Sequence, residues 1–261
     1  MQRSAAFLTT FASVLALAAC GGDDSTAPGN GGGNGGGNGG GNGAEPAAIA
    51  VVSGGGQSAK TQEALGQPFV AAVTDADGDA VSGATVTWSV VDGPGSISPS
   101  SPTTNAQGQA SATFTGGATL GTSTVRASVS GVSAAADFTV ETTTLVVLMQ
   151  NTAFVGPGGT DDVTVPLGAT IEWQNRDNEQ HTATSTDEPA GGADIISGLL
   201  GNGGSFSFAP GVEGTWTYRC DVHPTIMVGA TITVTAATGS ASAPGNDDPP
   251  PEPGDPDYPG G

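Results

Sequence analysis

The chain has 261 residues, 44 of them glycine, so part of it must be low-complexity and the folded part is smaller than the length suggests. The 25 acidic and 5 basic residues give a formal net charge of −20. This charge argues against nucleic acid as a partner, because the phosphate backbone would repel it, and favours partners that present a positive patch.

Residues 1–19 are predicted to be a secretory signal peptide. Arg3 supplies the positive charge, and the apolar run that follows is too short to span a bilayer as a stable helix. The run ends Leu-Ala-Ala-Cys20, which resembles the bacterial lipobox, in which the cysteine is acylated and becomes the new N-terminus. The alternative is an ordinary cleaved signal with an incidental cysteine. Gly21 resembles sorting to the outer membrane, which implies a lipid-anchored protein of the bacterial cell envelope, either periplasmic or surface-exposed.

Residues 20–44 are predicted to be a flexible tether. Repeats of Gly-Gly-Gly-Asn offer no apolar side chains to bury, so they behave as a flexible coil. With Cys20 assigned to the lipid, only Cys220 remains, and no intramolecular disulfide is available.

Residues 45–142 have the pattern of an immunoglobulin-like β-sandwich. Short runs of alternating apolar residues are separated by Gly, Pro, Asn and Asp clusters, and strands are expected at 49–52, 69–74, 85–90, 96–98, 109–114, 123–129 and 136–140. The stretch 79–88 and the polar turn 105–108 resemble bacterial Ig-like domains of the invasin type. Trp88 is expected to pack on an apolar core without the disulfide of antibody domains.

A second set of strands is expected in residues 143–236, and one of them delivers a thiol at its end. Trp216, Tyr218 and Cys220 alternate with polar residues, which indicates a half-buried strand. The other strands are expected at 145–150, 163–165, 170–175, 205–208 and 230–235, with Met149, Trp173 and Phe208 in the core.

Three soft or borderline ligands follow in the order Cys220-x2-His223-x3-Met227. A thiolate, an imidazole and a thioether together suit copper better than zinc, calcium or magnesium. The chain has only one other histidine, His181, just past the expected strand 170–175. A structural zinc site would need four Cys or His ligands, and only three exist. A Cys-His nucleophilic pair is a weaker alternative, because no third orienting group is evident.

This pattern resembles the cupredoxin family of small blue copper proteins, such as plastocyanin, amicyanin and pseudoazurin. The likeness covers about residues 144–235, including the runs 163–175 and 197–208. It implies a Greek-key β-sandwich that holds one copper ion, which cycles between Cu(I) and Cu(II). The implied ligands are His181, Cys220, His223 and, as a weak axial ligand, Met227. Family loops commonly place two or four residues between the second histidine and the methionine, and here there are three.

The resemblance also assigns roles around the ligands. In the family, a small polar residue at the position of Thr182 often hydrogen-bonds the cysteine loop; an ordinary strand threonine is the alternative. The second histidine of the loop reaches the surface through an apolar patch, which implies an electron-transfer face at His223, Pro224 and Ile226. His181 is expected to be more buried than His223.

The resemblance implies an electron carrier rather than an enzyme, with no small-molecule substrate. Residues 144–235 contain ten acidic and two basic residues, a net charge of −8, so a redox partner with a basic patch, such as a cytochrome-like protein, is expected. Two alternatives remain open: copper storage, buffering or delivery, and a surface adhesion protein in which copper only stabilises the fold.

Residues 237–261 are rich in proline, glycine, serine and acidic residues. Because proline removes hydrogen-bond donors and like charges repel, a solvated tail without packed structure is predicted.

Overall fold

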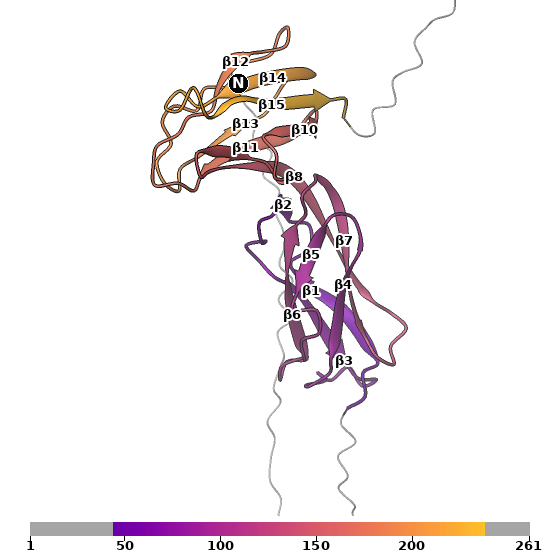
Figure 1. The fold of residues 1–261 in the computed structure, drawn as a ribbon. Coiled ribbons are helices and arrows are strands. Elements are labelled where there is room, and N and C mark those ends of the chain that lie inside the picture. The colour runs from indigo at the N-terminus through magenta and orange to yellow at the C-terminus, as the bar shows by residue number, and fades with distance from the viewer. Residues whose placement is uncertain (1–43, 238–261) are drawn as a thin grey trace, which may run out of the picture. The chain divides into compact units, whose positions relative to one another are not determined.

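The computed structural model describes residues 44–237, and the fold is all-β, as predicted (Figure 1). The predicted signal peptide, Cys20, almost all of the predicted tether and almost all of the predicted tail lie outside the described residues. Within residues 44–237, no helix is long and apolar enough to cross a membrane. The strands enclose two separate hydrophobic cores, one in each half of the described chain.

The N-terminal sandwich surrounds an aromatic core. Its strands are β1 (Ala48–Ser53), β2 (Ser58–Lys60), β3 (Phe69–Thr74), β4 (Val86–Asp92), β5 (Gly95–Ser98), β6 (Gln109–Gly116), β7 (Gly121–Val129) and the first part of β8 (Ala136–Gln150). One sheet has the order β1-β3-β6-β5, and β4, β7 and β8 lie next to one another in the other. Trp88 is 2% exposed, and its ring centroid lies 5.3 Å from that of Phe138, which stacks on Phe69 at 4.8 Å. Aromatic packing therefore occupies the middle of this core.

Strand β8 belongs to both sandwiches, and here the sequence prediction was wrong. Separate strands were expected at 136–140 and 145–150, but β8 is continuous over 15 residues. The intervening residues 141–144 are Glu-Thr-Thr-Thr; they contain no Gly or Pro to break the strand, and β-branched threonine favours extended backbone. The first part of β8 pairs with β7, its middle with the unpredicted β2, and its last part with β9 and β11.

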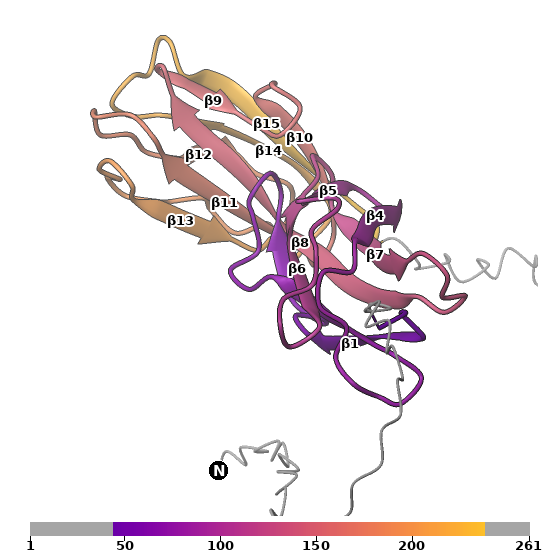
Figure 2. The same ribbon diagram turned by 90° about the horizontal axis from the view of Figure 1, so that it is seen from below.

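The C-terminal sandwich is formed by two sheets that face each other (Figure 2). Its further strands are β9 (Ala153–Val155), β10 (Asp162–Pro166), β11 (Thr170–Asn175), β12 (Thr184–Asp187), β13 (Ser205–Phe208), β14 (Gly214–Arg219) and β15 (Val228–Thr235). One sheet has the order β13-β11-β8, and the other β10-β15-β14-β12. The pairs β8–β11 and β10–β15 are parallel, whereas the other pairs in this sandwich are antiparallel.

The core of this sandwich is also aromatic, and it holds β11 against β14. Trp173 from β11 meets Tyr218 from β14 edge-on, with ring centroids 5.4 Å apart, and both are fully buried. Burial raises the pKa of the Tyr218 phenol far above its usual value, because the charged form would lose its hydration. Met149 is buried as predicted, whereas Phe208 is only partly buried and packs at the edge of the core.

A polar network connects β2 with β11. Lys60 Nζ donates to both carboxylate oxygens of Glu172, at 2.9 and 2.8 Å. Gln174 Nε2 donates to Glu172 at 2.9 Å and to Glu63 at 2.6 Å. Glu172 is only 8% exposed, so its carboxylate depends on these donors in place of water.

Replacing Lys60 should therefore destabilise the fold. Lys60→Met removes the only cation that hydrogen-bonds Glu172 within residues 44–237 and leaves a poorly hydrated carboxylate. We expect the free energy of unfolding in urea to fall by about 1–2 kcal/mol, since Lys60 itself is partly exposed. The double variant Lys60→Met/Glu172→Met should recover most of the loss. A single variant as stable as the native protein would contradict a stabilising role for this ion pair.

Candidate metal centre

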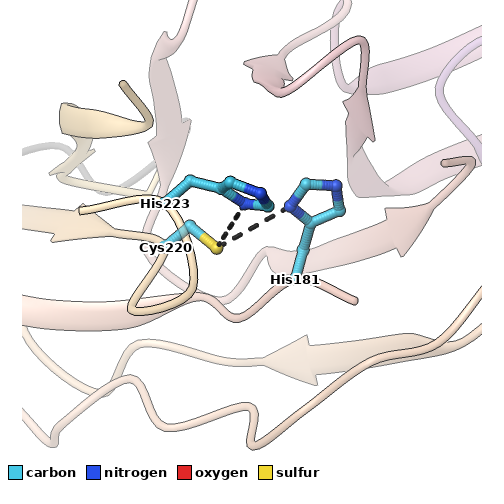
Figure 3. Close-up of side chains that lie close together, drawn as sticks. All are labelled: His181, Cys220 and His223. Carbon is cyan, nitrogen blue, oxygen red and sulfur yellow. Dashed lines mark hydrogen bonds between the residues drawn. The ribbon is translucent and has the colours of Figure 1, made fainter. Parts of the chain in front are cut away.

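Three potential metal ligands converge in the C-terminal sandwich, and Figure 3 shows the side chains of His181, Cys220 and His223 next to one another. The Nδ1 atoms of His181 and His223 each lie 3.7 Å from Cys220 Sγ, and the three ligand atoms all lie within 4.8 Å of one another. The two imidazole rings are inclined at 43° to each other. His181 and Cys220 are fully buried, whereas the His223 side chain is 19% exposed.

Strand β14 and the loop after it place Cys220, His223 and Met227. Trp216, Tyr218 and Cys220 are all buried on the core face of the strand, as their alternation predicts. The loop then closes on itself: Cys220 N–H donates to Met227 O at 2.9 Å, and Met227 N–H donates to His223 O at 3.0 Å. The three-residue spacing after His223 thus forms a hydrogen-bonded turn, and the side chain of Met227 is buried beneath it, in the same core cluster as Cys220.

A second segment presents His181 to this loop. The backbone of His181 makes two hydrogen bonds with Leu200, N–H to O at 3.1 Å and O to N–H at 2.8 Å. Asn175, at the end of β11, donates from Nδ2 to Leu200 O at 2.8 Å and to Glu179 O at 2.7 Å. These bonds fix the turn between β11 and His181 and therefore the direction of the imidazole.

Thr182 joins the two segments in two ways. Its backbone N–H points at Cys220 Sγ, with N and S 3.3 Å apart. Its hydroxyl oxygen accepts a hydrogen bond from Asp221 N–H at 2.8 Å. Thr182 therefore ties the backbone beside His181 to the loop that carries Cys220.

Two acidic residues that were not predicted from the sequence lie beside the histidines. Asp177 Oδ2 lies 2.9 Å from His181 Nε2, and Glu179 Oε2 lies 3.2 Å from His223 Nε2. Partial desolvation opposes ionisation of Asp177, but hydrogen bonds from Thr152 N–H, Asn151 N–H and His181 outweigh it and lower the pKa of its carboxyl. The spacing Asp-x-Glu-x-His was visible in the sequence, but it shows neither which acid meets which ring nor that the second ring comes from another segment.

The separations at Cys220 match those between two ligands of one metal ion. First-row metal bonds of about 2.3 Å to sulfur and about 2.0 Å to nitrogen, at angles of about 110–120°, place sulfur and nitrogen about 3.5–3.7 Å apart. Both nitrogen–sulfur distances at Cys220 are 3.7 Å, and the three ligand atoms lie within 4.8 Å of one another. The thiol and each imidazole are therefore spaced as two ligands of one metal ion would be.

Comparisons with known proteins found a family profile that matches one part of the chain and solved structures that are similar to part of it. The family profile of the bacterial Ig-like domain (group 1) matches residues 53–141, which confirms the predicted Ig-like domain. Among solved structures, a Cu(I) methionine variant of amicyanin is 22% identical and covers 36% of this chain and 83% of its own, with a TM-score of 0.31. An oxidized proline variant of amicyanin is 24% identical and also covers 36% of this chain and 83% of its own, with a TM-score of 0.31. No curated protein matches the chain.

Removing the Thr182 hydroxyl should loosen the cysteine loop. Thr182→Val preserves shape but leaves Asp221 N–H without its acceptor, so the free energy of unfolding should fall by about 0.5–1.5 kcal/mol. Amide hydrogen exchange at Asp221 should become faster in the same variant. Thr217→Val is the matched control, because that hydroxyl makes no hydrogen bond within residues 44–237. Equal exchange rates at Asp221 in native protein and both variants would contradict this role.

Proposed function

We propose that the C-terminal sandwich is a cupredoxin-like electron carrier and that its cluster binds one copper ion through His181, Cys220 and His223, with Met227 as a weak axial ligand. The observation that carries the proposal is the convergence of one thiol sulfur and two imidazole Nδ1 atoms, each nitrogen 3.7 Å from the sulfur. One thiolate and two imidazoles with a distant thioether are the ligand set of blue copper sites. Copper bound there would supply a one-electron couple, Cu(I)/Cu(II).

The chain itself supplies a site that is already assembled. The thiol and the first imidazole are fully buried, and backbone hydrogen bonds close the ligand loop without a metal ion. A site whose ligands need not move between oxidation states lets electrons transfer with little reorganisation.

The exposed edge of the cluster supports a docking face for the redox partner. His223 is its only partly exposed ligand, and the exposed apolar side chains of Val222 and Ile226 flank it in the loop. Leu199, also exposed, precedes the residue that pairs with His181. With a net charge of −8 over residues 144–235, this domain would attract a basic partner, such as a cytochrome-like protein, mainly by raising the encounter rate.

The colour of the copper-loaded protein tests the ligand set. One equivalent of Cu(II) should give an intense visible charge-transfer band from the Cys220 thiolate. Cys220→Ser has no thiolate and should lose this band, whereas Thr217→Val, a change at a partly exposed position of β14, should keep it. A Cys220→Ser variant that remained equally coloured would refute the proposed thiolate ligand.

Electron exchange tests the docking face. Ile226→Lys places a positive charge beside His223, so the rate of reduction by a basic cytochrome should fall while copper content and colour remain unchanged. The native rate should also fall as salt rises, because the screening length shortens to about 10 Å at 0.1 M. A rate that responds to neither change would favour copper storage or a structural copper site.

We also propose that acylated Cys20 anchors the protein to the bacterial envelope through the glycine-rich segment that follows it. The support is the Leu-Ala-Ala-Cys20 motif and the low-complexity segment directly after it. Cys20→Ser should move the protein from the membrane fraction to the soluble fraction, because the acyl chains supply the membrane affinity. Membrane association that survives this change would point to a different anchor.

A further inference from the structure

One short turn places a carboxylate on the outer nitrogen of each imidazole in the cluster. The residues between β11 and His181 include Asp177 and Glu179, four and two positions before the histidine. Asp177 Oδ2 lies 2.9 Å from His181 Nε2, and Glu179 Oε2 lies 3.2 Å from His223 Nε2. Both rings therefore have a carboxylate oxygen at Nε2 and the thiol sulfur near Nδ1.

We propose that Asp177 is a positioning residue that holds the proton of the His181 imidazole on Nε2, so that its Nδ1 lone pair faces Cys220 Sγ, and that Glu179 places a second negative charge beside the His223 ring. The proposal rests on the proposed copper site for its consequence, but its first step concerns the metal-free protein. A neutral imidazole is a donor at one nitrogen and an acceptor at the other. A carboxylate at Nε2 accepts only, so it selects the tautomer that can bind a metal through Nδ1.

The Asp177 carboxylate can only accept a hydrogen bond from the His181 ring. Its Oδ1 accepts from Asn151 N–H at 2.8 Å, and its Oδ2 accepts from Thr152 N–H at 3.1 Å as well as facing His181. Asn151 and Thr152 have positive φ angles of 53° and 55°, so the turn between β8 and β9 is held in the left-handed region by this carboxylate. Asp177 thus fixes the imidazole to a rigid turn of the sandwich.

The two carboxylates differ in exposure, and their effects should differ accordingly. The Asp177 side chain is 21% exposed and faces a fully buried ring. The Glu179 side chain is 70% exposed and meets the partly exposed ring of His223. Negative charge near a metal favours its more positive oxidation state, and water and salt screen that effect at the exposed position. Asp177 should therefore lower the reduction potential of a bound copper ion more than Glu179 does.

The tautomer of His181 in the metal-free protein is the first test. The chain has two histidines, so ¹⁵N NMR of the rings can be assigned with one His223→Gln variant. Spectra recorded well above the ordinary imidazole pKa of about 6.5 should show His181 with its proton on Nε2. Asp177→Ala should give a mixture of tautomers. A native His181 protonated on Nδ1, or an unchanged tautomer in Asp177→Ala, would overturn the proposal whether or not copper binds.

The affinities for Cu(II) and Cu(I) are the second test. Asp177→Asn preserves shape and removes the charge, so the ratio of Cu(II) to Cu(I) affinity should fall on the order of tenfold, which corresponds to a rise of about 59 mV in potential. Glu179→Gln should shift the ratio in the same direction by less. Glu213→Gln is the matched control, since Glu213 is an exposed acid at the opposite end of β14 from Cys220.

These measurements separate a positioning role from a purely structural one. If Asp177 only held the 151–152 turn, Asp177→Asn would lower the stability of the fold but shift the affinity ratio no more than Glu213→Gln does. That result would overturn the proposal for Asp177. Failure of the native protein to bind copper would refute the proposed function, while the tautomer of His181 would still decide whether Asp177 orients the ring.

Discussion

The candidate metal centre depends on the contacts of Thr182, which join two chain segments that lie far apart in sequence. Thr182 N–H points at Cys220 Sγ, and the hydroxyl of the same threonine accepts from Asp221 N–H. These two bonds set the distance between the backbone that carries His181 and the loop that carries Cys220 and His223. Because each side chain has few rotatable bonds, the nitrogen–sulfur separations follow from this backbone distance and from the orientation of the two rings.

The aromatic core behind the site makes that contact possible. Trp173 and Tyr218 hold β11 against β14, so the residues that follow the two strands emerge at the same end of the sandwich. Burying an imidazole and a thiol there would be costly without partners. Asp177 supplies a partner to the imidazole of His181, and Thr182 supplies one to the sulfur of Cys220. The same contacts that hold the imidazole and the thiol in place would also limit their movement during the electron transfer proposed for this site.

Much of this architecture could be predicted from the sequence because its signals are local. The alternation that ends at Cys220 predicts the strand and its buried face, and Trp88 and Trp173 lie in the cores where their strands place them. The continuity of β8 was missed because the polar residues 141–144 separate two apolar runs, although threonine favours extended backbone. Strand β9 has only three residues, and β12 has no apolar residue, so no alternation marks either strand.

The roles of Asp177 and Glu179 could not be read from the sequence for a different reason. Acidic residues are common in this chain, and nothing local distinguishes these two from the other exposed acids. Their importance comes from the turn after β11, which Asn175 closes through Glu179 O, and from the loop that brings His223 alongside. Only the meeting of these two segments gives each imidazole its own carboxylate.

The most direct measurement of the central claim is a crystal structure of the protein loaded with one equivalent of copper. The account predicts a single ion bound by Cys220 Sγ and by Nδ1 of both His181 and His223, with the Met227 sulfur on the axial side and Nε2 of His181 still on Asp177. Copper bound through an Nε2 atom, or bound elsewhere while the three side chains keep their places, would contradict it.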